Sequence, residues 1–487
     1  LRSWLRCRRK AWLDRHGDAN QRRWTAHRNL LLDDQQRSFV ALLPHKPGHG
    51  MAACAAGEEG VVGLRFKGEG PSGEPVEAHP PLLLRVAGQS RWGPFAYQPV
   101  LARQGRRITR EHQLPLALMG HLLEAYQVGP VPELLVLGGG GRRLERERIR
   151  LTSGLRKQLS EALRKLNADL ERPQPPALAA DRRKCTLCSW RESCSRVASA
   201  DGHLSEVSGI GAKRREMLQE LGVHGLNDLA SANPERLAVE MERFGEQHGD
   251  VARGLVAQAV AQRDGLVERL DSTFALPELQ GAPGVLLYDI ESDPDARHDF
   301  LHGFLRLPRQ SDGRWDLAAA TYHPLLVMAE HGEQRSWLRL QRLLSRYDGW
   351  PILHYGETET LSLRRLAQRQ GASDAQLRRL KRRLVDVHAR IRSHWRLPLS
   401  SYGLKSVAAW RGFRWSQAGV DGARALLWWR QWLGEGPKRR GSRHGLAWIF
   451  RYNQDDCRAT WAVAEWLLKE DDLLKTGPDT DQPTAGP

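Results

Sequence analysis

The segment over residues 284–293, GVLLYDIESD, constrains the fold more than any other part of the chain. It is a short apolar run that follows a proline-containing linker, and such a run predicts a buried β-strand. Asp289 and Glu291 stand two residues apart near its end, so their side chains point to the same side of the strand. Carboxylates buried side by side repel each other, and binding of Mg²⁺ or Mn²⁺ removes that cost. Two exposed acids at a strand end are the structural alternative.

A second acidic segment covers residues 351–367, PILHYGETETLSLRRLA. Its pattern predicts a strand that ends near His354 and a helix that starts near Glu357. Glu357 and Glu359 then lie in the first helical turn, where the helix dipole favours acids. That favourable interaction also explains both acids without any catalytic role.

A third segment, residues 446–467, predicts a helix because its apolar residues recur at intervals of three and four. Tyr452 and Asp456 are four positions apart and share one helix face. A phenol beside a carboxylate can orient or deprotonate a water, whereas a Tyr–Asp surface pair is the alternative. Strand and helix patterns alternate over residues 283–471, which predicts an α/β domain.

Taken together, the three segments resemble the DEDD exonucleases of the RNase H-like superfamily. The strand motif, the second acidic motif and the helix motif of that family match Asp289-Ile-Glu291, His354-Tyr-Gly-Glu-Thr-Glu359 and Tyr452-Asn-Gln-Asp-Asp456. The second motif carries Glu359 where the family usually has Asp, which keeps Glu357 as the alternative acid.

The resemblance implies phosphodiester hydrolysis with two Mg²⁺ or Mn²⁺ ions, in the 3′→5′ direction. It implies that Asp289 bridges both ions and that Glu291 and Asp456 complete one of the two sites. Glu359 would serve the other site, and Tyr452 would align the attacking water.

The segment that follows residue 385 resembles the YprB-like subgroup of this superfamily. Asp386 and the stretch Ser401-Tyr402-Gly403-Leu404-Lys405 carry the resemblance. It implies that Asp386 contacts the residues that bind the metal without binding the metal itself, and that Lys405 lies near a phosphate. A solvated lysine on a helix is the alternative for Lys405.

The cysteines of the chain predict a second metal site. Cys185, Cys188 and Cys194 fall within ten residues, and Cys7 is the candidate for the fourth ligand of a closed site. Zinc is the general interpretation of this spacing. The distant first cysteine and the C-x2-C-x5-C ending resemble the iron–sulfur RecB-type nucleases, which implies a [4Fe–4S] cluster. Cys54 and Cys457 are predicted to be inert packing residues.

A RecB-type nuclease domain also needs a Pro-Asp … (Asp/Glu)-x-Lys pattern, which this chain lacks. Pro81 stands in place of the first acid, Leu101 in place of the second, and Arg103 in place of the lysine. Met119 lies near the position of the family's later tyrosine. The N-terminal domain is therefore predicted to be catalytically inactive.

A helical stretch over residues 199–268 contains Ser208-Gly209-Ile210-Gly211 and then Lys213 and Arg214, and it matches a helix-hairpin-helix motif. Glycines at Gly209 and Gly211 allow backbone N–H groups to approach a phosphate, and the cations strengthen that contact. An ordinary helical hairpin with a glycine turn is the alternative.

The balance of charges points to nucleic acid, since 74 Lys and Arg stand against 57 Asp and Glu and the net charge is +17. No apolar run reaches the length of a membrane span, so a cytoplasmic protein is expected. Residues 434–445 are rich in glycine and basic residues and predict an exposed, mobile loop.

The whole chain thus resembles a multidomain α/β nuclease. It would comprise a degenerate PD-(D/E)xK-like domain, a small all-α helix-hairpin-helix segment, an RNase H-like domain and a disordered tail, over residues 1–198, 199–268, 283–471 and 472–487. We expect an exonuclease that acts on DNA, in preference to RNA, in repair or recombination, with a helicase or repair protein as a possible partner. A non-catalytic scaffold that binds nucleic acid is the alternative.

Overall fold

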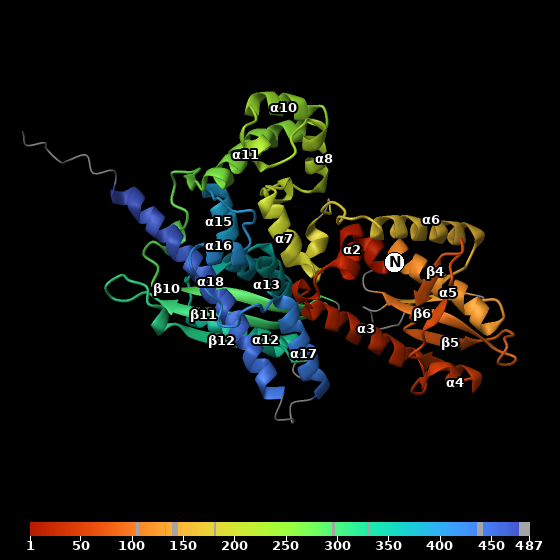
Figure 1. The fold of residues 1–487 in the computed structure, drawn as a ribbon. Coiled ribbons are helices and arrows are strands. Elements are labelled where there is room, and N and C mark those ends of the chain that lie inside the picture. The colour runs from red at the N-terminus through yellow and green to blue at the C-terminus, as the bar shows by residue number, and fades with distance from the viewer. Residues whose placement is uncertain are drawn as a thin grey trace, which may run out of the picture. The chain divides into compact units, whose positions relative to one another are not determined.

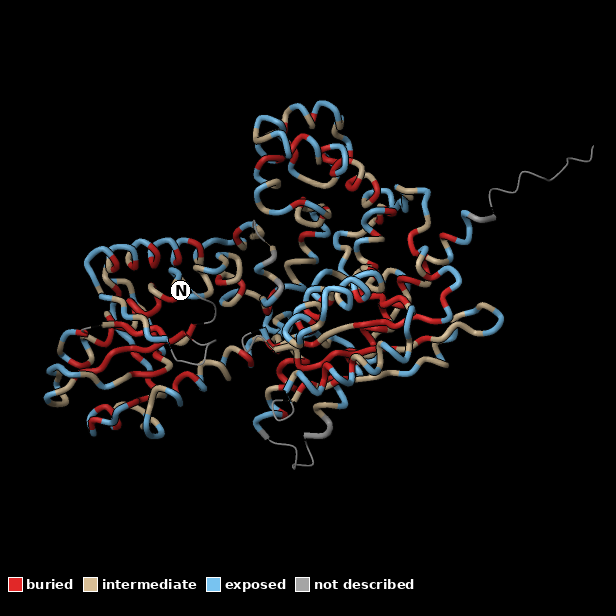
Figure 2. Tube along the Cα trace, turned by 180° about the vertical axis from the view of Figure 1, so that it is seen from behind, coloured by how far each residue is buried: buried red, intermediate tan, exposed pale blue. Residues whose placement is uncertain are grey.

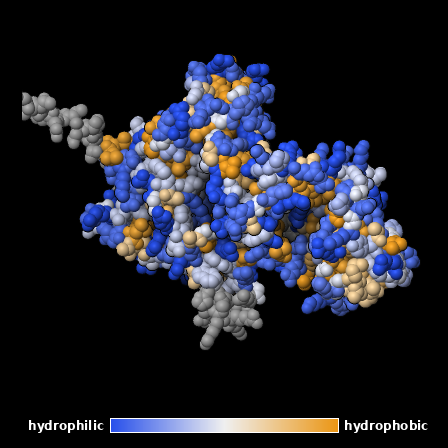
Figure 3. All heavy atoms as spheres, in the orientation of Figure 1, coloured by the Kyte–Doolittle hydropathy of each residue, from blue (hydrophilic) through white to orange (hydrophobic). Residues whose placement is uncertain are grey.

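The computed structural model (Figure 1) describes residues 1–103, 107–131, 133–138, 145–179, 182–294, 298–328, 332–435 and 442–476. The chain divides into two compact units, Leu1–Val197 and Ala198–Pro487. Buried residues concentrate on the strands of the two large sheets (Figure 2), and hydrophilic residues cover most of the face shown in Figure 3. Within the described ranges, none of the helices has the length and apolar character that crossing a membrane requires.

The first unit is built around a six-stranded sheet with the order β1-β2-β5-β6-β7-β8. Its elements are α1 (Arg2–Arg6), α2 (Arg8–His16), α3 (Ala26–Leu42), β1 (Gly48–His49), α4 (Gly50–Ala55), β2 (Gly60–Val62), β3 (Phe66–Glu69), β4 (Pro75–Ala78), β5 (Leu82–Val86), β6 (Ala96–Arg103), α5 (Arg110–Gln127), β7 (Leu134–Gly138), β8 (Glu145–Ile149), α6 (Ser153–Leu170) and α7 (Arg191–Ala200).

Strand β6 is buried on both faces, which explains its nearly continuous apolar sequence. Leu101 packs into the core that α5 and α6 cover, whereas Val100 packs into the core that includes Phe39 of α3. The alternation of side chains along the strand therefore assigns consecutive residues to opposite layers.

Asp169 ties the N-terminal helices of this unit to α6. Its carboxylate is almost fully buried and accepts from Trp4 Nε1 at 2.7 Å and from the guanidinium of Arg8, with Arg172 at 3.3 Å. The hydrogen bonds from Arg8 are the largest cause that lowers the pKa of Asp169. A lowered pKa in the folded state stabilises the fold above the usual pKa of an aspartate, and this stabilisation is lost as the pH falls through the folded value.

We expect Asp169→Ala to lower the free energy of unfolding by about 2–3 kcal/mol at neutral pH, because the indole and guanidinium groups lose their acceptor. Urea denaturation measures this change, and Glu171→Ala at the exposed end of α6 is the control. The wild type should lose stability below about pH 4 more steeply than the variant does. Equal pH dependence of the two proteins would contradict the role assigned to Asp169.

The second unit contains a five-stranded sheet with the order β12-β11-β10-β13-β14. Its elements are α8 (Ala212–Glu220), α9 (Leu226–Ala230), α10 (Pro234–Glu242), α11 (Glu246–Asp264), β9 (Glu268–Arg269), β10 (Gly284–Asp293), β11 (His298–Pro308), β12 (Thr321–Leu326), α12 (Gly332–Arg346), β13 (Ile352–His354), α13 (Glu357–Arg369), α14 (Asp374–Arg383), β14 (Leu384–Asp386), α15 (Val387–His394), β15 (Trp395–Arg396), α16 (Leu404–Trp410), α17 (Gly422–Glu435) and α18 (Ser442–Thr476).

Strand β10 is the buried strand that the sequence predicts. It pairs antiparallel with β11 and parallel with β13, and helices cover both of its faces. Leu287 belongs to the core that α18 covers, whereas Leu286 belongs to the core under α12, α13 and α14. This double burial explains why the strand is apolar up to its two acids.

The predicted tail over residues 472–487 is wrong for its first part, because α18 continues to Thr476. Leu473, Leu474 and Lys475 favour a helix, and the first helix-breaking residues of the sequence are Gly477 and Pro478. Residues 477–487 lie outside the described part of the chain.

The predicted loop over residues 434–445 is also too long. Helix α17 extends to Glu435, and α18 starts at Ser442. Residues 436–441, to which the prediction then applies, lie outside the described residues.

Candidate metal centre

Three carboxylates meet where α18 crosses the end of β10. Asp289 and Glu291 come from β10 and Asp456 comes from α18, and one oxygen atom of each lies within 4.8 Å of the others. Glu291 and Asp456 are buried, with 6% and 7% of their surfaces exposed. The tertiary fold thus joins two sequence motifs that lie more than 160 residues apart into one oxygen-rich site.

The electrostatics of this cluster favour a bound cation. Burial raises the pKa of Asp289 well above its usual value, and the carboxylates of Asp456 and Glu291 raise it further. Burial likewise raises the pKa of Glu291 well above its usual value and that of Asp456 to about 6. Carboxyl groups this close resist ionising together unless positive charge is added. Oxygen ligands of this kind suit Mg²⁺ or Mn²⁺.

Glu359 is buried at the start of α13, and its Oε2 atom has no hydrogen-bond partner in the described structure. Burial is the largest cause that raises its pKa to about 7, followed by the carboxylates of Asp386 and Asp456. The structure does not bring Glu359 into the group of three oxygens within 4.8 Å, although its charge acts on that group. Glu357 is exposed on the same helical turn. Between these two acids, the buried Glu359 is therefore the one that faces the cluster.

Tyr452 lies one helical turn before Asp456 and is 5% exposed. Burial raises the pKa of its phenol far above the usual value, and the charge of Asp456, Glu291 and Asp289 raises it further. In this environment the phenol keeps its proton and can donate a hydrogen bond.

Lys405, at the start of α16, places a positive charge beside the same cluster. Its Nζ atom lies 5.1 Å from the ring centre of Tyr452 and donates to the Val420 oxygen at 2.6 Å. The charge of Lys405 lowers the pKa of Glu291 and of Asp456, which shows that it acts on both carboxylates.

Asp386 supports the backbone near the site. Its Oδ1 atom accepts from the backbone N–H of Gly356 and from that of His388, both at 2.9 Å. The first contact holds the turn that leads into α13 and Glu359, and the second caps α15. With these bonds made, Asp386 positions the backbone, and the structure places it outside the group of three oxygens.

Asn453 was not identified from the sequence, although it is fully buried within the site. Its Nδ2 atom donates to Asp289 Oδ2 at 2.6 Å, and its Oδ1 atom accepts from the Tyr322 hydroxyl at 2.7 Å. A Cβ atom at Gly303 would lie 1.6 Å from Asn453 Oδ1, so a glycine is required there. Its position directly after Tyr452 was the only signal in the sequence, because its partners Asp289 and Tyr322 come from the distant strands β10 and β12.

Further contacts hold the two adjacent acids of α18. Trp415 Nε1 donates to Asp456 Oδ1 at 2.6 Å, and Ser416 donates to Asp455 from both its backbone nitrogen and its hydroxyl, at 2.8 and 2.6 Å. The loop between α16 and α17 is therefore attached to α18 beside a candidate ligand. The sequence carries no signal for these partners, because the loop has no motif.

The four predicted cysteine ligands line one small cavity. Cys7 comes from the junction of α1 and α2, and Cys185, Cys188 and Cys194 come from the segment around the start of α7. Among the described residues their sulfur atoms do not form a group within 4.8 Å, in contrast to the three carboxylates. Cys54 and Cys457 are fully buried and lie apart from this cavity.

Residues with packing or ion-pairing roles occupy the positions where a RecB-type nuclease carries its acids and lysine. Leu101 is part of the core, and Arg103 is buried and forms ion pairs with Glu145 and Glu147 at 2.8 and 2.5 Å. Pro81 directly precedes β5, and Met119 packs against the core from α5. In the described part of this unit no three His, Cys, Asp or Glu side chains form a metal-type group within 4.8 Å.

The glycine turn of the helical segment is exposed, as contact with a phosphate requires. Gly209 has a φ of +90°, which favours glycine, and Gly211 and Lys213 are exposed at the start of α8. Arg214 instead turns back and donates to the Gly209 oxygen at 2.7 Å. The element before the turn is a 3₁₀ turn, Leu204–Glu206, where the sequence predicted a helix.

Charge is distributed unevenly between this helical segment and the first unit. Residues 198–264 contain seven Lys and Arg against eleven Asp and Glu, whereas residues 1–197 contain 34 Lys and Arg against 19 Asp and Glu. The first unit therefore carries most of the net positive charge of the protein, because 34 minus 19 gives +15 of the total of +17. The helical segment is acidic overall, which weakens the prediction that it attracts nucleic acid.

Comparison with known proteins identifies the domain that contains the carboxylate cluster. A family model described as the RNase H superfamily matches residues 286–468. A search of curated proteins finds no match to the chain. The matched range contains Asp289, Glu291, Glu359 and Asp456 together.

Proposed function

Because residues 286–468 form a domain of the RNase H superfamily, we propose that this protein is a metal-dependent nuclease, specifically a 3′→5′ exonuclease that acts on DNA. The observation that carries the proposal is the group of Asp289, Glu291 and Asp456, whose oxygens lie within 4.8 Å of one another. The match to the RNase H superfamily supports action on nucleic acid. Direction and preference for DNA rest on the resemblance of the motifs to DEDD exonucleases.

The carboxylates of Asp289, Glu291 and Asp456 would hold the divalent cations, with Glu359 as the fourth acid. When bound, Mg²⁺ or Mn²⁺ supplies positive charge to the phosphate and lowers the pKa of a water. The side chains around the carboxylates would then position the phosphate and the water. Tyr452 can donate a hydrogen bond from its protonated phenol, and Lys405 provides a positive charge that acts on Glu291 and Asp456.

Degradation of end-labelled single- and double-stranded DNA and RNA tests the proposal. We expect the purified protein to shorten DNA in the presence of Mn²⁺ and to stop when EDTA is added, because the acids cannot bind substrate phosphate without cations. A 5′ label should show a ladder of products, which is the pattern of 3′→5′ removal. Binding of nucleic acid without degradation of any substrate would instead support the non-catalytic scaffold.

For the cysteine cavity we propose a [4Fe–4S] cluster as the resident group. The four cysteines line one cavity of the first unit. The resemblance of their spacing to that of the iron–sulfur RecB-type nucleases favours the cluster over zinc. Four thiolates also fit the ligand chemistry of the cluster. The first unit would then be an inactive RecB-like domain that the cluster ties together.

We expect protein purified without oxygen to show a broad absorption band at about 400 nm and to contain iron, since thiolate-to-iron charge transfer absorbs there. Cys188→Ser removes one ligand and should abolish the band, whereas Cys54→Ser at a buried cysteine outside the cavity should retain it. Stoichiometric zinc in a colourless wild-type protein would establish the alternative metal.

A further inference from the structure

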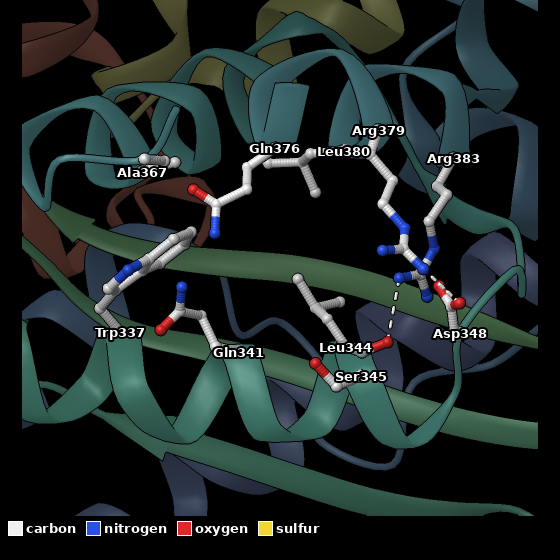
Figure 4. A pocket seen from close by; sticks show the side chains of 11 residues that line it. Trp337, Gln341, Leu344, Ser345, Asp348, Ala367, Gln376, Arg379, Leu380 and Arg383 are labelled. Atoms are coloured by element: carbon white, nitrogen blue, oxygen red, sulfur yellow. Dashed lines mark hydrogen bonds and ion pairs between the residues drawn. The ribbon is translucent and has the colours of Figure 1, made fainter. Parts of the chain in front are cut away.

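A cleft of about 360 Å³ lies between α12 and α14, on the face of the second sheet opposite α18 (Figure 4). This volume falls within the usual range for pockets that bind small molecules. None of the residues discussed for the metal centre lines it. The cleft is therefore a separate feature of the same domain.

Two amide side chains and an indole meet at one end of the cleft. Trp337 and Gln341 come from α12, and Gln376 comes from α14 and points toward the indole (Figure 4). The Oε1 atom of Gln376 accepts from the backbone N–H of Ser373 at 2.8 Å. Because the oxygen is used by that bond, the amide nitrogen of Gln376 is the end that faces the cleft. This end of the cleft combines an aromatic surface with hydrogen-bond donors.

The other end of the cleft is held by arginines. Arg383 donates to the backbone oxygens of Leu344, Tyr347 and Trp350, at 2.7–3.0 Å, so its guanidinium fixes the connection that follows α12. Arg379 forms an ion pair with Asp348 at the rim. This side of the cleft therefore holds two guanidinium groups and one carboxylate, that of Asp348, which pairs with Arg379.

The two helices that form the cleft are strongly basic. Helices α12 and α14 together contain nine Lys and Arg against two acids, Glu333 and Asp374. Glu333 is paired with Arg369 of α13. Such a charge density attracts an anionic ligand to the mouth of the cleft.

We propose that the cleft binds one nucleotide unit, with the base against Trp337 and its acceptor atoms toward the amide nitrogen of Gln376. The phosphate would lie toward the basic residues of α14. A nucleotide combines a flat ring, acceptor atoms and negative charge, which are the three properties that the lining complements. Where the nucleotide unit belongs to a polynucleotide, this inference rests on the proposed nuclease function and deepens it.

Saturation-transfer NMR with a deoxynucleoside monophosphate tests the cleft directly in the full-length protein. We expect transfer to the base protons in the wild type and at least a fivefold weaker affinity in Gln376→Glu. Glutamate preserves the bond to Ser373, because it retains the acceptor of a capping box, but replaces the donor in the cleft with a negative charge. Gln334→Glu adds the same charge to an exposed part of α12 outside the cleft and should change the affinity less than twofold.

The same variants are compared for binding of a labelled oligonucleotide in EDTA, which prevents cleavage. A loss with Gln376→Glu for both ligands assigns the site to a nucleotide within a strand, and a loss for the mononucleotide alone assigns it to a free nucleotide. Absence of transfer in the wild type, or equal affinity of Gln376→Glu and Gln334→Glu, would overturn the proposal. Failure of the nuclease function would appear separately, as wild-type protein that binds the nucleotide but degrades no substrate.

Discussion

Asp289→Asn should lower the rate of DNA degradation by at least about a hundredfold to a thousandfold, the range found when one charge-stabilising group is removed from an active site. Asp289 is the member of the cluster whose pKa is raised by both of the other carboxylates, so it lies between them electrostatically. Asparagine keeps the size of the side chain and an acceptor for Asn453 while removing the charge that a cation requires. The rate of release from an end-labelled strand at saturating Mn²⁺ measures the effect.

Thermal unfolding separates loss of chemistry from loss of fold. Without metal, Asp289→Asn should be at least as stable as the wild type, because one of the mutually repelling acids has become neutral. Addition of Mn²⁺ at about one hundred times its dissociation constant should stabilise the wild type by about 2–3 kcal/mol and the variant far less. Asp312→Asn, in an exposed turn of the same domain, should behave as the wild type in both assays. Full activity of Asp289→Asn would exclude the proposed metal centre.

Asn453→Ala should reduce activity and Mn²⁺ affinity by about tenfold to a hundredfold, the range for groups that orient metal ligands. The change removes the donor to Asp289 Oδ2 and leaves the Tyr322 hydroxyl without its acceptor. Asp289 then loses the contact that fixes its orientation, so higher Mn²⁺ concentrations should be needed. Calorimetric titration with Mn²⁺ gives the affinity independently of catalysis.

Gln454→Ala, at the next residue of α18, is the matched control for Asn453→Ala. Tyr322→Phe is the graded variant, since it breaks the outer bond of the pair and keeps the bond between Asn453 and Asp289. We expect its defect to lie between those of the wild type and Asn453→Ala. If Asn453→Ala lowers only thermal stability and leaves the Mn²⁺ affinity unchanged, Asn453 has a packing role alone.

The elements that carry the candidate site could be predicted because each has a strong local signal. Strand β10 is apolar up to its acids, α13 starts with acids, and the helix around Asp456 repeats its apolar residues at helical spacing. The supporting residues lack such signals. Trp415 lies in a loop, and nothing nearby in the sequence indicates that its indole reaches Asp456.

The cysteine site was likewise predictable only in part from local sequence. The spacing of Cys185, Cys188 and Cys194 suggested a shared metal group, and a local motif of this kind is visible in one segment of sequence. Cys7 was the candidate fourth ligand in the sequence, and the packing of the N-terminal helices against the segment that leads into α7 brings it to the same cavity. Asp14, for example, accepts from Trp190 Nε1 at 2.8 Å and so holds α2 beside that segment.

The sequence alone determined the chemistry of the candidate metal centre, because residue type and local spacing decide which groups are available on one strand and one helix. It also determined where the strand with Asp289, the helix with Glu359 and the helix with Asp456 lie, although the end of the last helix at Thr476 was misjudged. Only the tertiary structure decided which acids share an oxygen cluster, since Asp289 and Asp456 meet through the pairing of β10 and the path of α18. The tertiary structure likewise decided the role of Asn453, because a buried amide acts through partners on other strands and local sequence carries no record of them.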